Sequence, residues 1–110
     1  MTKQEIIVKI NADFKGKARN NNRCAYLTGD GKKCAIGLFI PDGHKGQFHT
    51  GTVIELLNDF PDLKPHMPSQ NLDFLRDLQR HHDTYLGIGM PLEDQKEALM
   101  SFVQEYKGAV

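Results

Sequence analysis

Four segments of the sequence repeat apolar residues at the spacing of an amphipathic helix, and glycine or proline bounds them. The spacing predicts helices over residues 3–14, 52–60 and 91–107, and a third one in chain order that ends at residue 86 and that either Ser69 or Asn71 can cap. None of them approaches the roughly 18–20 apolar residues that a membrane span needs. We therefore expect short helices that must pack on other elements to bury their apolar faces.

Local signals indicate where these helices begin. Thr2 with Glu5, and Thr52 with Glu55, match the capping box, in which the two side chains accept hydrogen bonds from otherwise unpaired backbone N–H groups. Pro91 suits the first position of the last helix. The predicted buried stripe of the third helix is Leu72, Leu75, Leu78, His82 and Leu86, and that of the last helix is Gln95, Ala98, Leu99, Phe102, Val103 and Tyr106.

A hairpin signal lies between the first two helices. Asp30-Gly31 separates two short runs that contain apolar residues, and both types of residue accept the positive φ of a tight turn. Such a hairpin would bring Cys24 and Cys34 to similar heights on adjacent strands. Because a two-stranded hairpin is not stable alone in water, it must lie on helices. The sequence therefore predicts an α+β fold, a small single domain over residues 1–110 with about four helices packed on one β-hairpin.

Charge is unevenly distributed along the 110 residues, although the 14 basic and 14 acidic side chains cancel. Residues 1–33 carry eight basic and three acidic side chains, a net charge of +5, and the remainder carries −5. A basic region attracts phosphates because each Lys or Arg near a phosphate releases condensed counterions. Since dedicated nucleic-acid domains are usually basic overall, we do not expect a nucleic-acid partner and favour a small anionic ligand or an acidic protein.

The expected compartment is the cytoplasm. The first residues lack the apolar stretch and the small-residue cleavage site of a signal peptide, and two cysteines do not make a disulfide scaffold. We expect no membrane partner. The short apolar stripes leave a thin core, so a homodimer is a natural way to bury more apolar surface.

A set of motifs gives the sequence a family resemblance. The motifs are Cys24, then Lys32-Lys33-Cys34-Ala35-Ile36-Gly37, then Ile40-Pro41-Asp42, and later Leu78-Gln79 and His82-Asp83. Over residues 23–83 the chain resembles short proteins of unassigned activity that tailed bacteriophages and prophages encode. Members of that family commonly carry acidic residues soon after Ile-Pro-Asp, where this chain has Gly43-His44-Lys45-Gly46. The resemblance implies action inside a bacterial host cell, against a host factor or a host signalling nucleotide.

The residues themselves favour binding over catalysis. Basic side chains flank the end of the first helix and the predicted hairpin, namely Lys15, Lys17, Arg19, Arg23, Lys32 and Lys33. They can form a patch for phosphates, and Tyr26 can stack on a base. Gly29-Asp30-Gly31 lacks the spacing and the Lys-Ser/Thr of a phosphate-binding P-loop. We therefore expect a phage-type binding protein that engages a host protein or a phosphate-bearing small molecule through this basic hairpin region.

One alternative is a thiol-dependent enzyme that uses Cys34 and His82. Lys32 and Lys33 would lower the pKa of the thiol, and the imidazole would act as the base. Neighbouring residues on a helix point about 100° apart, so Asp83 is not expected to orient the ring of His82. A histidine on a leucine stripe is more often a core residue with a hydrogen-bond partner, and we lean toward a protein that is not an enzyme.

The other alternative is an interaction module stabilised by zinc. Cys24, Cys34, His44 and His49 supply two thiolates and two imidazoles, a set that can bind zinc tetrahedrally. The nine residues between the cysteines depart from the two-to-four-residue spacing of common zinc fingers. Two buried cysteines without a cofactor are therefore the simpler interpretation.

Overall fold

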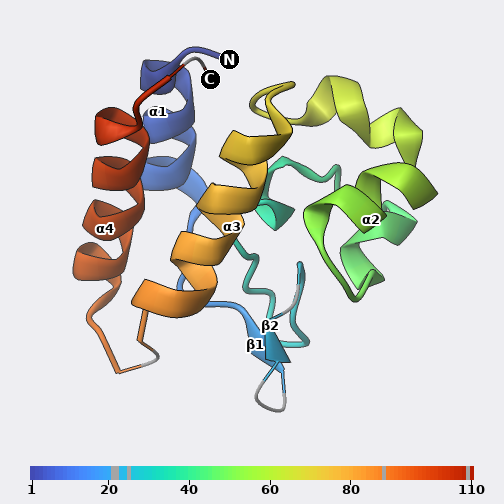
Figure 1. Cartoon of the computed structure of the whole chain (residues 1–110). Helices are drawn as coiled ribbons and strands as arrows, with labels where there is room; N and C mark the ends of the chain where they lie inside the picture. The colour runs from blue at the N-terminus through green and yellow to red at the C-terminus, as the bar shows by residue number, and fades with distance from the viewer. Residues whose placement is uncertain (21–22, 25, 88, 109) are drawn as a thin grey trace.

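The computed structural model describes residues 1–20, 23–24, 26–87, 89–108 and 110, without the side chains of residues 19–20 and 23–24. This part of the chain is built mainly from helices (Figure 1). The α-helices are α1 (Lys3–Asp13), α2 (Val53–Asp59), α3 (Leu72–Tyr85) and α4 (Leu92–Glu105). The segments between them hold the 3-10 helices η1 (Gly37–Phe39), η2 (Lys45–Phe48) and η3 (Pro61–His66), and the strands β1 (Arg19–Asn20) and β2 (Arg23–Cys24).

The predicted α+β class is wrong, because the strand pairing is too short to carry helices. β1 and β2 are two residues each, and their antiparallel register places Cys24 opposite Arg19 instead of beside the strand predicted for Cys34. Asp30-Gly31 does lie in a turn, in which the N–H of Thr28 donates to the carbonyl of Lys32. Among the described residues, a single isolated bridge between residues 27 and 33 follows this turn before the chain enters η1.

The predicted helix starts are largely confirmed. Thr2 and Glu5 form a complete capping box at α1, and Thr52 and Glu55 form another at α2. Each box satisfies backbone N–H groups that the first helical turn leaves unpaired. Pro91 caps α4 from one residue before the helix instead of occupying its first position.

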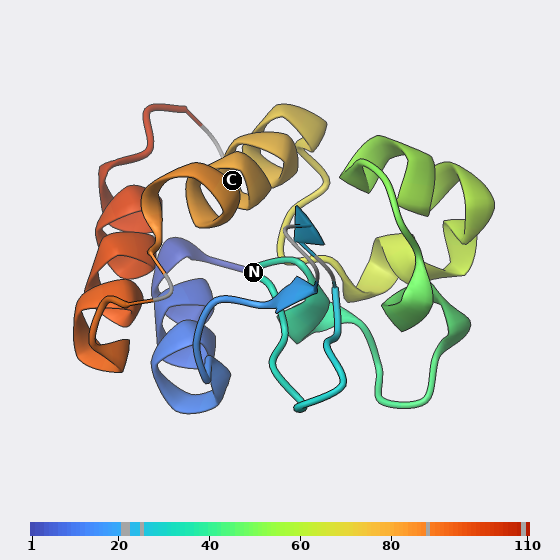
Figure 2. The same cartoon turned by 90° about the horizontal axis from the view of Figure 1, so that it is seen from below.

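α3 lies in the middle of the helices, with α1 and α4 on one side of it and α2 and η3 on the other (Figures 1 and 2). α4 runs antiparallel to α1, and lysines join the pair at both ends: Lys3 Nζ donates to the Tyr106 carbonyl (2.7 Å) and Lys96 Nζ to the Asn11 carbonyl (2.9 Å). α3 contacts α4 on one side and α2 on the other, and α2 contacts η3. The largest fully buried side chains are Phe14, Phe74, Ile6, Ile10, Ile36, Ile40, Leu56, Leu63, Leu75, Leu78, Leu86 and Leu99.

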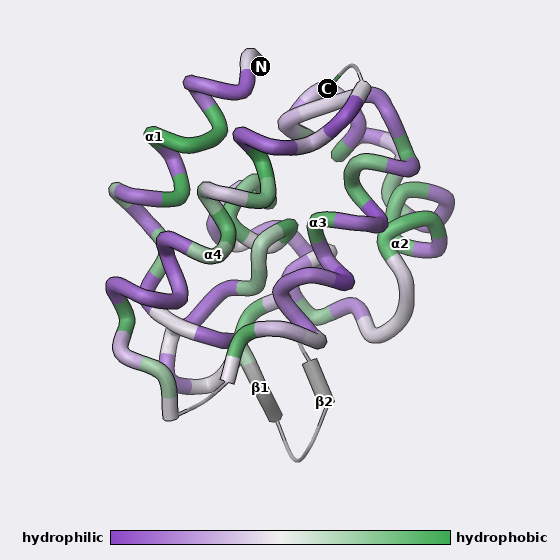
Figure 3. Tube along the Cα trace, turned by 60° about the vertical axis from the view of Figure 1, so that its left-hand side comes forward, coloured by the Kyte–Doolittle hydropathy of each residue, from purple (hydrophilic) through white to green (hydrophobic). Residues whose placement is uncertain are grey.

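The hydrophobic stripes of α3 and α4 face this core. Along both helices, hydrophobic residues recur at helical spacing among hydrophilic ones, so that one side of each helix is apolar (Figure 3). The predicted stripe residues of α3 are buried except Leu72, which is 44 % exposed at the first helical position. In α4, Gln95, Leu99 and Val103 are buried, and the remaining predicted residues are partly buried. Among the described residues, no helix has the length and apolarity to cross a bilayer.

Candidate functional site

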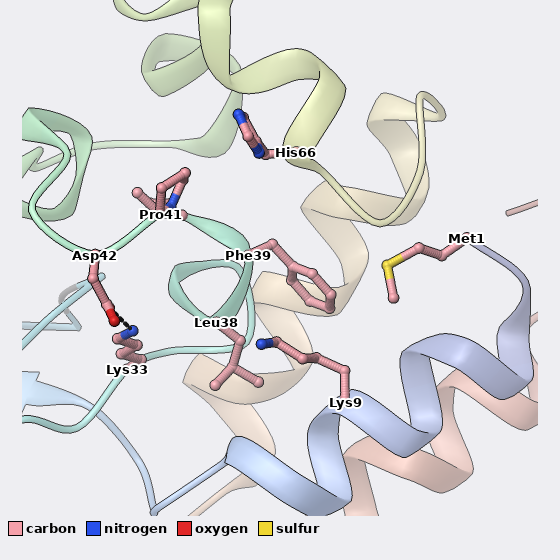
Figure 4. Close-up of a pocket in the computed structure, with 9 residues that line it drawn as sticks. Met1, Lys9, Lys33, Leu38, Phe39, Pro41, Asp42 and His66 are labelled. Atoms are coloured by element: carbon pink, nitrogen blue, oxygen red, sulfur yellow. Dashed lines mark hydrogen bonds and ion pairs between the residues drawn. The ribbon is translucent and has the colours of Figure 1, made fainter.

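Two adjoining hollows open beside α1 and η1, and lysines line both. One encloses about 450 Å³ and the other about 340 Å³. Lys9, Lys33, Leu38 and Asp42 line both hollows, so the two form one continuous groove. Figure 4 shows the Lys9 side chain reaching from α1 toward Leu38, with the Lys33–Asp42 pair on the opposite side. We call this depression the lysine groove.

Two separate segments bring the lysines of this groove together. Lys9 projects from α1, Lys15 follows the end of that helix, and Lys33 follows the Asp30-Gly31 turn. The side chain of Lys32 lies next to Gly16, just after the end of α1, where φ is +125°. A side chain at Gly16 is disfavoured at this φ. Local backbone geometry therefore sets where the lysine groove lies.

Carboxylates partly neutralise the lysine groove. Lys9 pairs with Asp13, and Lys33 pairs with Asp42. The hydrogen bond from Lys9, supported by the charges of Lys15 and Lys33, holds the pKa of Asp13 below its ordinary value. The hydrogen bond and charge of Lys33 do the same for Asp42. Because both carboxylates are well exposed, these pairs are weak, and a phosphate with more charge can replace them.

Lys17 was predicted to bind the ligand, but the structure buries it. Its Nζ donates to the carbonyl of Asp83 at 2.7 Å and to the carbonyl of Leu86 at 2.6 Å, at the end of α3. The backbone N–H of Lys17 also donates to Gln95 Oε1 of α4 at 2.8 Å. A helix C-terminus leaves its last carbonyls unpaired and carries partial negative charge, so the ammonium caps α3. Lys17 therefore holds the fold together and is not free for a phosphate.

Tyr26 is likewise buried, which overturns its predicted role as a stacking platform. Only 3 % of Tyr26 is exposed, and its hydroxyl donates to the Gly51 carbonyl at 3.0 Å. Burial raises the pKa of this hydroxyl far above its ordinary value. Arg19 and Arg23 were also predicted to bind the ligand, and their side chains lie outside the described part of the chain.

Sequence reasoning named Lys15, Lys32 and Lys33 among the basic residues of the predicted patch but missed Lys9. The available signal for Lys9 was the charge count, since this lysine contributes to the net charge of +5 over residues 1–33. That count does not show which lysines converge in space.

Cys34 is fully buried, in contrast to the expectation that Lys32 and Lys33 would activate its thiol. Burial, with a smaller contribution from the carboxylate of Asp83, raises the pKa of the thiol to about 12. The backbone N–H of Gly37, which donates to the sulfur at 3.2 Å, offsets this only in part. At neutral pH Cys34 is therefore a thiol, which is a weak nucleophile.

His82 lies beside Asp83, and the prediction that Asp83 could not orient its ring is wrong. His82 Nδ1 and Asp83 Oδ1 are 2.9 Å apart, while the N–H of Ala18 donates to His82 Nε2 at 3.3 Å. Because Nε2 accepts, Nδ1 carries the proton and donates to Asp83. Both nitrogens of the imidazole are thus occupied within the fold, and neither is free to accept a proton from Cys34.

Residues 34–37 and residues 78–83, on which the suggested resemblance rests, meet in the core of the structure. Asp83 and Gln79, from the second of these ranges, lie close enough to Cys34 to influence its thiol. Gln79 Nε2 donates to Asp83 Oδ1 at 3.1 Å. An ideal Cβ on Gly37 would lie 2.0 Å from the carbonyl oxygen of Tyr26, so only glycine fits there. The motif residues therefore position η1, which forms the floor of the lysine groove.

His44 and His49, two of the proposed zinc ligands, each contact a different aspartate. His44 Nε2 lies 2.7 Å from Asp62 Oδ2, and its Nδ1 accepts from the N–H of Gly46 at 2.8 Å. His49 Nε2 lies 3.0 Å from Asp59 Oδ2. The side chain of Cys24 lies outside the described part of the chain. Within that part, no three His, Cys, Asp or Glu side chains gather as a metal site would require.

A third hollow, of about 610 Å³, lies between α3 and α4 and differs in chemistry from the lysine groove. Its lining is largely aromatic, with His81 stacked on Phe102 at a ring separation of 4.8 Å and Tyr85 at its rim. Glu105 and Lys107 are its charged members. It shares none of its lining residues with the lysine groove.

The lysine groove can bind an anion by direct contact with ammonium groups and can hold an organic group against its floor. Lys9, Lys15 and Lys33 supply the positive charge, and η1 with the residues that follow it supplies the apolar surface. No protein-family model and no solved structure matches this chain.

Proposed function

We propose that this chain is a bacteriophage-type protein that binds a phosphate-bearing small molecule in the cytoplasm of its bacterial host. The observation that carries the proposal is the convergence of Lys9, Lys15 and Lys33 on one groove from two separate segments, α1 with its end and the turn that precedes Lys33. Lys32 lies next to them, 42 % exposed, with Asp30 at 3.7 Å. Lys15, Lys32 and Lys33 belong to the basic region named from the sequence, and Lys9 is added to them by its place in the groove.

The surroundings of the lysines favour a compact phosphate over an extended polyanion. Asp13, Asp30 and Asp42 lie among them and would repel a nucleic-acid backbone laid across the surface. A phosphate group that enters the groove contacts several ammonium groups at once and replaces the exposed carboxylates as their partners. Charge-assisted hydrogen bonds of this kind are about twice as strong as neutral ones.

Calorimetric titration with sodium pyrophosphate tests this proposal. The variant Lys9→Gln/Lys33→Gln removes two of the ammonium groups, and Lys45→Gln removes an exposed lysine of η2 that lines neither hollow. We expect the double variant to bind about a hundredfold more weakly, since each charge-assisted contact contributes about a factor of ten. The Lys45→Gln variant should bind as the unchanged protein does.

Raising the salt concentration provides a second readout. Because exposed charges are screened by ions, the affinity for pyrophosphate should fall between 50 and 200 mM KCl, and the double variant should show a weaker dependence. Equal affinity of the double variant and the unchanged protein, or an absence of pyrophosphate binding at low salt, would remove the lysine groove as the binding site.

A further inference from the structure

The two hollows of the lysine groove differ in the residues that line only one of them. Asp13, Lys15 and Gly31 line only the smaller hollow, which we call the polar end. The residues that line only the larger hollow are mostly apolar, and we call it the apolar end. The larger hollow is lined by Met1 and His66 and by the consecutive residues Leu38, Phe39, Ile40, Pro41 and Asp42. The two ends are joined through Lys9 and Lys33, which line both.

The apolar end is held in place by the fold. Leu38 and Phe39 belong to η1, whose 3-10 turns are closed by hydrogen bonds from the N–H of Phe39 to the Ile36 carbonyl and from the N–H of Ile40 to the Gly37 carbonyl. Leu38 is 5 % and Phe39 8 % exposed, so they form a fixed floor. Figure 4 shows the Phe39 ring between Met1 and Leu38, with His66 above Pro41.

His66 is the exposed member of this end. It terminates η3, and its side chain faces the same hollow as Phe39 and Pro41. Because the imidazole ring of His66 is exposed, it can stack on a planar group without any movement of buried side chains. Stacking of a base on an aromatic side chain contributes about 1–3 kcal/mol in proteins that bind single strands.

From this arrangement we infer that the ligand is a nucleoside phosphate, with its phosphates at Lys9, Lys15 and Lys33 and its base against Leu38, Pro41 and His66. The inference rests on the proposed function and extends it from phosphate to a specific class of phosphate ester. Pyrophosphate or a simple phosphate salt uses only the polar end and leaves the apolar end exposed to water. The two hollows, of about 450 and 340 Å³, together have the size usual for small-molecule sites.

The test compares ligands that share the phosphates and differ in the base. Pyrophosphate, adenosine and each of the four common ribonucleoside 5′-diphosphates are titrated into the full chain by calorimetry. We expect at least one nucleoside diphosphate to bind at least about tenfold more tightly than pyrophosphate, because burial of the base adds apolar contact. Adenosine alone should bind more weakly than adenosine diphosphate.

The variant His66→Ala separates the two ends of the groove. It should lower the affinity for the nucleoside diphosphate about tenfold and leave the affinity for pyrophosphate unchanged. Lys9→Gln/Lys33→Gln should weaken both ligands. A thermal melt of each variant establishes that it remains folded.

The outcomes distinguish failure of this inference from failure of the proposed function. If pyrophosphate binds and none of the four nucleoside diphosphates binds more tightly, the base site is overturned and the phosphate site stands. If neither pyrophosphate nor any nucleoside diphosphate binds, both are overturned. Loss of pyrophosphate binding in folded His66→Ala would also contradict the division of the groove into two ends.

Discussion

Replacement of Lys17 by methionine tests whether this lysine maintains the fold. Methionine retains a long apolar side chain and removes the ammonium that donates to the carbonyls of Asp83 and Leu86 at 2.7 and 2.6 Å. Two backbone acceptors at the end of α3 then lose their partner in a region that is largely closed to water. The change therefore removes a helix cap from the interior of the protein.

The expected loss of stability follows from these contacts. Hydrogen bonds to a charged group contribute about 1.5–3 kcal/mol each, and release of the buried ammonium to water in the unfolded state offsets part of that sum. The net expectation is a loss of about 2–3 kcal/mol. For a domain of this length, that loss lowers the melting temperature by about 10 °C.

Urea unfolding followed by circular dichroism measures the effect. Lys15→Met is the matched control, because Lys15 lies two residues away and is exposed. The control should change the free energy of unfolding by less than about 0.5 kcal/mol. Equal stability of Lys17→Met and Lys15→Met would refute the assignment of Lys17 to the cap of α3.

Three further predictions follow from the packing and the pKa shifts. Gly37→Ala forces a Cβ against a backbone carbonyl and should cost several times more stability than Gly29→Ala, whose Cβ meets nothing within 4 Å, and equal costs in urea unfolding would refute this packing. With the other cysteine replaced by serine, Cys34 should react with iodoacetamide at pH 8 about a thousandfold more slowly in the folded state than in urea, because its pKa of about 12 compares with 9.0 for a free thiol; similar rates would show an accessible thiolate. The hydrogen bond from His44 lowers the pKa of Asp62, so this carboxylate contributes stability that is fully present above pH 3.8 and is lost as the pH falls through its lowered pKa in the folded state. Asp62→Asn should therefore make the melting temperature fall less steeply between pH 4 and pH 2, and an unchanged slope would contradict the pairing.

Local sequence patterns predicted the helices because their determinants are local. Capping boxes act over four residues, and the apolar stripes of α3 and α4 repeat within each helix. The periodicity even placed His82 and Gln95 in the core although both are polar. The structure explains this, since His82 Nε2 and Gln95 Oε1 accept from the backbone N–H groups of Ala18 and Lys17, respectively.

The hairpin prediction failed because a turn alone does not specify strands. The Asp30-Gly31 turn forms, but the residues after it are needed in the core, and Gly37 must approach the Tyr26 carbonyl so closely that the chain bends into η1. Extended pairing beyond the bridge at residues 27 and 33 would remove Cys34 from its position near Asp83. Tertiary packing thus overrides the local preference for strand.

The lysine groove could be predicted only as a basic region. Lys17 belongs to that region in sequence, yet its partners are the carbonyls of Asp83 and Leu86, which lie more than 60 positions away. No local pattern separates it from Lys15, which remains exposed. Whether a lysine binds a ligand or caps a helix is decided by contacts that form only on folding.

The most direct test of the account is to locate bound pyrophosphate on the protein by NMR. Amide chemical shifts of the ¹⁵N-labelled chain are followed as pyrophosphate is added, and the residues that move are mapped onto the structure. The account predicts saturable shifts at residues 9–15 and 31–33, which surround the polar end of the lysine groove. Saturable shifts confined to the aromatic hollow of α3 and α4, or an absence of saturable shifts, would contradict it.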